Sequence, residues 1–287
     1  MSTVALIGPP GVGKSTMVVK TAVKRPIHIL DVDRKVGSMA TFQPYIKSGE
    51  LTYKEIGETI AEDSLALRLN ELVEDKKSNR PPRGWTAIAN YVGQLEKDPQ
   101  AQAAGTILWD SYTLTAQHMR AHIQWLKGKS KFVWDDWTTW YAMWTEVTTI
   151  MCDYALATGK DFMITIHERV NEKPGDRTKG VQVNEHVSPQ GVPMRSKTYL
   201  GTMDILIAGS VAGQFGLEFA AHFTDVYRLA IDMVGDSPKW VCRVLPDGLR
   251  DLRCSHEVYG QAEWEPDFGK IWNAQKPVVT TKEVIKK

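Results

Sequence analysis

Several features that would place this 287-residue sequence in a specialised class of protein are scarce or missing. It has only three cysteines, at positions 152, 242 and 254, which are too few and too scattered for a disulfide framework or a zinc site. No apolar run approaches the roughly 18 residues that a membrane helix needs, and the first residues show neither a charged-then-apolar leader nor a cleavage site. We therefore expect a cytoplasmic protein in a reducing environment, without a membrane partner.

An excess of charge of either sign is also missing. Thirty-five basic and 34 acidic residues give a net charge of +1, which excludes a uniformly cationic surface that coats nucleic acid but allows a local basic patch. A composition of 43% hydrophobic and 24% charged residues excludes wholesale disorder. Because no internal repeat or long low-complexity linker divides the chain, we expect one α/β domain with decorations.

The clearest positive signal is a phosphate-binding loop. Residues 4–7 form a short apolar run, and the next segment fits the pattern G-x-x-x-x-G-K-[ST]. Glycines in such a loop let backbone N–H groups point at phosphate oxygens, and the following helix adds the positive end of its dipole. No guanine-reading Asn-Lys-x-Asp motif is present, which favours ATP over GTP. We expect ATP and Mg²⁺ to be bound by Gly8, Pro9, Pro10, Gly11, Val12, Gly13, Lys14, Ser15 and Thr16, with Lys14 on the β- and γ-phosphates and Ser15 on the metal.

Two further apolar runs carry acidic residues at their carboxyl ends: residues 26–33 end in Asp33, and Asp110 is the last residue but one of 106–111. In an open α/β sheet, groups that contact ligands gather at the carboxyl ends of the strands. We expect Asp110 to hold the Ser15 hydroxyl and to share Mg²⁺ with it, and Asp33 to polarise the attacking water. The alternative for each aspartate is a solvated acid in a turn after a strand.

A third apolar run, residues 160–168, has a polar tip. Thr165 or His167 could contact the γ-phosphate there; we prefer His167 because it lies at the end of the run, and a simple strand-capping histidine is the alternative. The segment 169–210 that follows is predicted to be a long, mobile basic loop. Its candidate contacts to DNA are Arg177, Lys179, Arg195 and Lys197, and a disordered loop without a partner is the alternative.

Apolar spacing predicts helices over residues 59–78 and 85–95. The segment 125–144 holds five of the ten tryptophans. Helical spacing that continues through Val147 and Met151 favours a buried apolar face. A base-stacking platform, supplied with charge by neighbouring lysines, is the alternative.

Residues 223–229 and 240–245 alternate as an antiparallel strand pair does. Arg253, and less clearly Arg250, follow a turn after this pair and are candidates for an arginine finger that reaches a neighbouring subunit's nucleotide. An ordinary surface arginine is the alternative. The last residues carry five lysines against one glutamate, so we divide the chain into a core over 1–268 and a basic tail over 269–287.

The order of these features resembles the RecA-like ATPase core, in particular the phage AAA-type nucleotide-binding proteins that include the Sak-class single-strand annealing proteins. The resemblance covers about residues 3–255 and rests mainly on the phosphate loop, Asp110-Ser111 and residues 165–168. It implies a mainly parallel, twisted sheet flanked by helices, with the sensor strand between the phosphate-loop strand and the Asp110 strand. It also implies a homo-oligomer, either a ring or a filament, with ATP sites between subunits and single-stranded DNA on the loops after the sensor strand.

What the resemblance implies for function is ATP-dependent annealing or homologous recombination, in the host cytoplasm if a phage encodes the chain, with a single-strand-binding protein as a further partner. The sequence departs from the family at Asp33, where members carry glutamate, and at Asp251-Leu252-Arg253, where members tend to have Lys-x-Arg. The shorter acid leaves open whether hydrolysis is slow or stimulated by DNA. Two other functions stay open: a nucleotide-dependent assembly switch that acts on a protein partner, and a small-molecule kinase.

Overall fold

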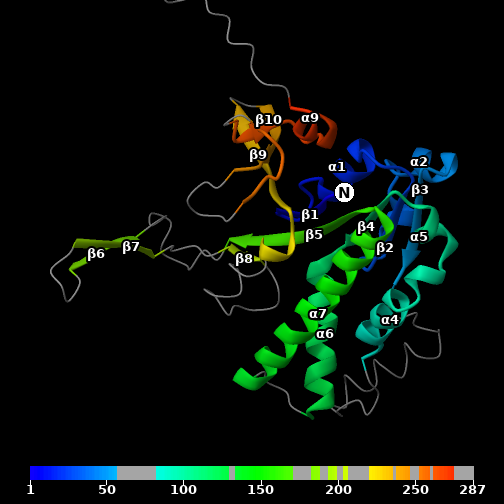
Figure 1. Cartoon of the computed structure of the whole chain (residues 1–287), viewed down its shortest axis with the longest axis horizontal. Coiled ribbons are helices and arrows are strands. Elements are labelled where there is room, and N and C mark those ends of the chain that lie inside the picture. Colours follow the sequence, from blue (N-terminus) through cyan, green and yellow to red (C-terminus); the bar gives the residue numbers. More distant parts are fainter. Residues whose placement is uncertain are drawn as a thin grey trace, which may run out of the picture.

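A computed structural model describes the parts of the chain that build one large sheet and its covering helices (Figure 1). The described residues are 1–56, 82–128, 133–170, 182–187, 193–198, 203–205, 220–234, 237–245, 252–258 and 261–274. The strand order is β11-β10-β9-β1-β5-β4-β2-β3, and β8 pairs with β5. The parallel part consists of β1 (Thr3–Gly8), β2 (Ile27–Asp31), β3 (Leu51–Glu55), β4 (Thr106–Asp110), β5 (Asp161–Val170) and β9 (Asp225–Val234).

The central strands are apolar throughout because helices cover both faces of the sheet. Every residue of β1, β2 and β4 is buried. Alternate residues serve opposite faces: Leu108 packs with the cluster that includes the helix after the phosphate loop, whereas Ile107 and Trp109 pack with the opposite cluster. The first face carries α1 (Lys14–Thr21), α2 (Gln43–Ser48) and α9 (Phe268–Trp272), and the second carries α4 (Arg83–Val92), α5 (Pro99–Ala103), α6 (Tyr112–Leu126) and α7 (Trp134–Thr158).

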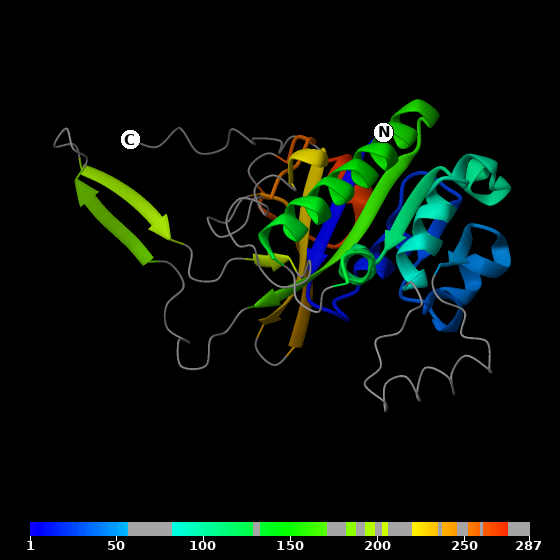
Figure 2. The ribbon, with the colours of Figure 1, turned by 90° about the horizontal axis from the view of Figure 1, so that it is seen from below.

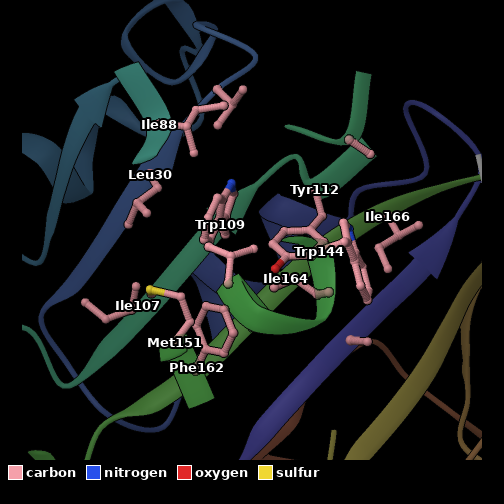
Figure 3. Close-up of a cluster of buried hydrophobic side chains, with 14 of the residues drawn as sticks. Leu30, Ile88, Ile107, Trp109, Tyr112, Trp144, Met151, Phe162, Ile164 and Ile166 are labelled. Atoms are coloured by element: carbon pink, nitrogen blue, oxygen red, sulfur yellow. The ribbon is translucent and has the colours of Figure 1, made fainter. Parts of the chain in front are cut away.

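The tryptophan-rich segment forms much of the second face. The Asp136 carboxylate accepts the Val133 backbone N–H at 2.9 Å, which starts α7. Trp140 and Trp144 are buried, and Tyr112 lies edge-on to Trp144 with ring centroids 5.1 Å apart (Figure 3). The structure therefore confirms the predicted buried apolar face, and these two rings are not available as a platform for bases.

The strand order confirms the fold class that the RecA-like resemblance implies. Strand β5 lies between β1 and β4, with Gly8 opposite His167 and Leu108 opposite Met163. The predicted late antiparallel pair is β9 and β10 (Ser237–Arg243), to which the short β11 (Glu263–Trp264) adds. The result is a mainly parallel sheet flanked by helices, with antiparallel strands at one edge.

The prediction of a continuous loop over residues 169–210 is wrong. Strand β5 runs on to Val170, β6 (Gln182–Val187) and β7 (Pro193–Thr198) form a hairpin, and β8 (Met203–Ile205) pairs antiparallel with β5. Both hairpin strands are largely polar, so no hydrophobic alternation marks them in the sequence. Figure 2 shows the hairpin standing apart from the main sheet.

The boundaries of the other predicted elements differ less from those in the structure. The predicted helix at 85–95 corresponds to α4 and to the 3₁₀ turn η2 (Leu95–Lys97), and two further 3₁₀ turns are η1 (Val36–Ser38) and η3 (Ala220–His222). Because α9 buries Phe268 and Ile271, the core extends beyond residue 268. The predicted helix at 59–78 and most of the basic tail lie outside the described residues. None of the helices in the described ranges is long and apolar enough to cross a membrane.

Candidate nucleotide-binding site

The phosphate loop joins the carboxyl end of β1 to the first turn of α1. Gly11 and Gly13 have φ angles of 77° and 95°, a left-handed conformation that favours glycine. Gly8 has a different requirement: a Cβ atom there would lie 2.5 Å from the Leu229 carbonyl oxygen of β9. The glycines of the motif thus permit both the turn of the loop and the close packing of β1 against β9.

Lys14 lies folded over this loop. Its ammonium group donates to the carbonyl oxygens of Gly8 and Pro9, both at 2.9 Å, and the residue is buried. A phosphate is a stronger acceptor than a neutral carbonyl, because the hydrogen bond is then assisted by charge on both partners. Lys14 is therefore placed where a phosphate on the loop would compete for its ammonium group.

Three elements meet at the carboxylate of Asp110, which ends β4 and is 1% exposed. Its Oδ2 accepts the hydroxyl of Ser15 at 2.6 Å, and its Oδ1 accepts the hydroxyl of Thr165 at 2.5 Å. Ser15 belongs to α1 and Thr165 to β5, the strand beside β4. The structure thus brings Ser15 and Asp110 together as the sequence predicts, and adds Thr165, the less favoured of the two polar candidates on this strand.

A second carboxylate, Asp33, lies two residues beyond the end of β2. Its Oδ1 accepts the Ser111 hydroxyl at 2.7 Å, and its Oδ2 lies 2.7 Å from the Lys35 ammonium and 3.8 Å from His167 Nε2. Burial alone would raise the pKa of Asp33, but the contacts with His167, Lys35 and Ser111 hold it well below its usual range. Asp33 and His167, both predicted site residues, are thus neighbours.

The other acid of this segment, Asp31, shapes the turn that follows β2. Its carboxylate accepts the backbone N–H groups of Val36 at 2.8 Å and Lys35 at 3.3 Å. Burial raises the pKa of Asp31 to about 6, although these hydrogen bonds oppose the shift. The intervening Arg34 has a left-handed φ of 56°. Asp31 therefore stabilises the backbone of the turn, and Asp33 is the acid that contacts the other residues of the site.

Lys35 and Thr113 are site residues that the sequence analysis missed, and Ser111 was named there only as part of the resemblance, without a role. Ser111 orients Asp33, and the Thr113 hydroxyl accepts the His167 backbone N–H at 2.8 Å. Lys35 lies only two residues after Asp33, but no motif marks it. Ser111 follows directly on the strand that ends in Asp110, and Thr113 lies two residues further on. Their position just after this strand end is the one signal that could have given them a role.

The oxygen atoms gathered here suit Mg²⁺, a hard cation that is usually held by one or two carboxylates and by the phosphates of its substrate. Within the described ranges, no group of three or more His, Cys, Asp or Glu side chains could hold a metal ion by itself. A cationic group already lies at the acids, because the Lys35 ammonium is 2.7 Å from Asp33 Oδ2 and 3.7 Å from Asp110 Oδ2. The donor set therefore fits Mg²⁺ that is shared between Ser15, Asp110 and a nucleotide.

Arg253 lies away from this site in its own chain. Its backbone pairs with Val226, which is opposite Ala5 in the middle of β1, and its guanidinium donates at 3.3 Å to the carbonyl of Phe223, which precedes β9. The loop, by contrast, follows the carboxyl end of β1. A role for Arg253 at a neighbouring subunit's nucleotide stays a prediction. Arg250, Arg177 and Lys179 lie outside the described residues.

No protein-family model and no curated protein sequence matches the chain. Among solved structures it is similar to the flagellar accessory protein FlaH from Methanocaldococcus jannaschii, at 12% identity and a TM-score of 0.34, over 84% of this chain and 76% of that one. It is also similar to a KaiC-like protein from Pyrococcus horikoshii OT3, at 13% identity and a TM-score of 0.34, over 88% and 81% of the two chains. The fold assignment rests on the strand order and not on these likenesses.

Proposed function

We propose that the chain is a Mg²⁺-dependent ATPase that binds single-stranded DNA and promotes annealing or strand pairing, as in phage recombination. The observation that carries the ATPase part is the meeting of the Ser15 and Thr165 hydroxyls on the Asp110 carboxylate. Ser15 and Asp110 would hold the metal, which would neutralise charge on the β- and γ-phosphates. Lys14 and the N–H groups of the loop would bind the same phosphates.

Asp33 is the residue that would orient the attacking water. A carboxylate whose pKa lies well below its usual range is a weak base, so Asp33 would act by accepting a hydrogen bond from the water. This suits phosphoryl transfer, whose loose transition state depends more on positioning than on a strong base. Ser111 would keep the Asp33 carboxylate in place, and His167 would sense the γ-phosphate from the adjacent strand.

The DNA part of the proposal rests on the continuity of β5. The strand that carries Thr165 and His167 runs on to Val170, and its last residues pair with β8 beyond the β6–β7 hairpin. Arg195 and Lys197 lie two positions apart in β7, and alternate residues of a strand share one face. In the sequence, β5 thus leads to a hairpin with two basic residues on one strand, and a homo-oligomer would align several such hairpins along one DNA strand.

One observation favours an assembly switch with slow hydrolysis as a second candidate. Asp33 is paired with Lys35 at 2.7 Å and accepts from Ser111, so both of its oxygens are engaged. If nucleotide binding does not break this pairing, Asp33 could not orient the water and hydrolysis would be slow. The nucleotide-bound state would then persist, and a partner protein could recognise it.

The test is ATP turnover by the purified protein with and without single-stranded DNA. We expect DNA to raise turnover, Lys14→Ala to abolish it, and the double variant Arg195→Ala/Lys197→Ala to lose the stimulation but keep the basal rate. The matched control removes two exposed lysines from helices, Lys20→Ala/Lys47→Ala, and should keep the stimulation. ATP binding with turnover that ignores DNA would overturn the DNA part and favour the switch, and absence of ATP binding would overturn both.

A further inference from the structure

We propose that Lys35 is a positioning residue that takes the place of the metal ion: its ammonium group pairs with Asp33 and Asp110 and has to leave before Mg²⁺ can bind. The inference rests on the proposed function, because it concerns the same Mg²⁺–nucleotide site. It adds a residue that no phosphate-loop motif contains and a competition that the motif does not imply.

The position of the ammonium group is the first support. Lys35 Nζ lies 2.7 Å from Asp33 Oδ2 and 3.7 Å from Asp110 Oδ2. The same Asp110 oxygen accepts the hydroxyl of Ser15 at 2.6 Å, so the ammonium shares an oxygen with the expected metal ligand. A divalent cation on that oxygen and an ammonium group 3.7 Å from it would repel each other at close range.

The local backbone is the second support, because it directs Lys35 toward the acids. Asp31 accepts the backbone N–H groups of Lys35 and Val36, and Arg34 adopts a left-handed φ of 56° between the two aspartates and Lys35. These contacts turn the chain back immediately after β2. The lysine is therefore held at the site by a specific turn and does not reach it as a long side chain from a distant surface.

Charge and exposure are the third support. The side chains of Asp110 and Asp33 are 1% and 16% exposed, and two such carboxylates near each other need a cation to offset their repulsion and desolvation. The Lys35 side chain is 38% exposed, so it can move into solvent without breaking the core. When Mg²⁺ arrives with nucleotide, Lys35 would move out and release Asp33 Oδ2 to orient the water. The exchange would thus keep Asp33 from acting until the metal is in place.

The test measures binding of Mn²⁺, a spectroscopic substitute for Mg²⁺, by electron paramagnetic resonance. The protein is saturated with a non-hydrolysable ATP analogue, whose phosphates complete the ligand set of the metal. A competitor that fills a site nine-tenths of the time weakens the apparent affinity about tenfold, so Lys35→Met should bind Mn²⁺ at least about tenfold more tightly than the wild type. Lys35→Gln should do the same, Lys35→Arg should stay weak because it keeps the cation, and the control Lys47→Met on exposed α2 should not differ from wild type.

A merely structural role for Lys35 would give the opposite result, since a variant with a damaged site binds metal less tightly. Equal or weaker Mn²⁺ binding by folded Lys35→Met and Lys35→Gln would overturn the inference. Binding of Mg²⁺–ATP by the same proteins separates the two proposals. If the wild type binds Mg²⁺–ATP but the variants show no gain in Mn²⁺ affinity, only the role of Lys35 fails. If the wild type does not bind Mg²⁺–ATP, the proposed function fails.

Discussion

Replacing Thr165 by valine removes a hydroxyl from the centre of the site and leaves a side chain of nearly the same shape. Thr165 is fully buried, and its hydroxyl donates to Asp110 Oδ1 at 2.5 Å. A hydrogen bond to a charged group contributes about 1.5–3 kcal/mol, roughly twice the value for a neutral pair. The variant leaves a buried carboxylate oxygen without this donor, so we expect the free energy of unfolding to fall by about 2–3 kcal/mol.

The matched control is Thr106→Val in the neighbouring strand β4. Thr106 is also fully buried, but its hydroxyl donates at 2.7 Å to a neutral acceptor, the Lys24 backbone carbonyl, so the expected loss is about 1 kcal/mol. Urea unfolding followed by tryptophan fluorescence gives both values, provided that the slope m is unchanged. Equal losses in the two variants, or a loss below about 0.5 kcal/mol for Thr165→Val, would refute the view that Asp110 is a buried, charged acceptor at this site.

Three further predictions concern the loop, a buried histidine and the aromatic cluster. Gly8→Ala places a Cβ atom 2.5 Å from the Leu229 carbonyl oxygen, so β1 and β9 must separate; we expect unfolding free energy to fall by about 1–3 kcal/mol, and a melting curve unchanged from wild type would contradict this. Burial lowers the pKa of His28 to about 4, against the opposing charge of Asp98. Because the folded state then resists protonation, stability should fall by up to about 3 kcal/mol as the pH drops from about 6.5 to 4, and urea titrations of His28→Gln should show a shallower loss. Trp144→Ala, at a fully buried position, should cost about 3–5 kcal/mol in the same assay, and a loss below about 1 kcal/mol would count against the cluster as core.

The central strands could be predicted from the sequence because both of their faces are covered. Residues 4–7 and 107–109 are therefore continuous apolar runs, and a motif or an aspartate follows each one directly. The β6–β7 hairpin gave no such signal. Its strands pair through their backbones, with Arg195 opposite Glu185, and their polar side chains show no apolar alternation.

The site likewise contains residues that a sequence pattern marks and residues that none marks. The phosphate loop and Asp110 follow from a motif and from the rule that strand ends gather ligands. Which of Thr165 and His167 reaches Asp110 depends on the register between β4 and β5, where Trp109 lies opposite Ile164, and a single sequence does not fix that register. The position of Lys35 depends on a left-handed residue and on hydrogen bonds within one turn, so no spacing rule could have placed it there.

Calorimetric titration with ATP in Mg²⁺ or in EDTA shows directly whether the phosphate loop and Asp110 bind a nucleotide together with Mg²⁺. We expect the wild type to bind ATP at least about tenfold more tightly with Mg²⁺ than in EDTA. Asp110→Asn should lose this difference but keep the affinity measured in EDTA, and Lys14→Ala should bind poorly in both buffers. Wild-type affinity that is the same with and without Mg²⁺, or no binding at millimolar ATP, would contradict this expectation.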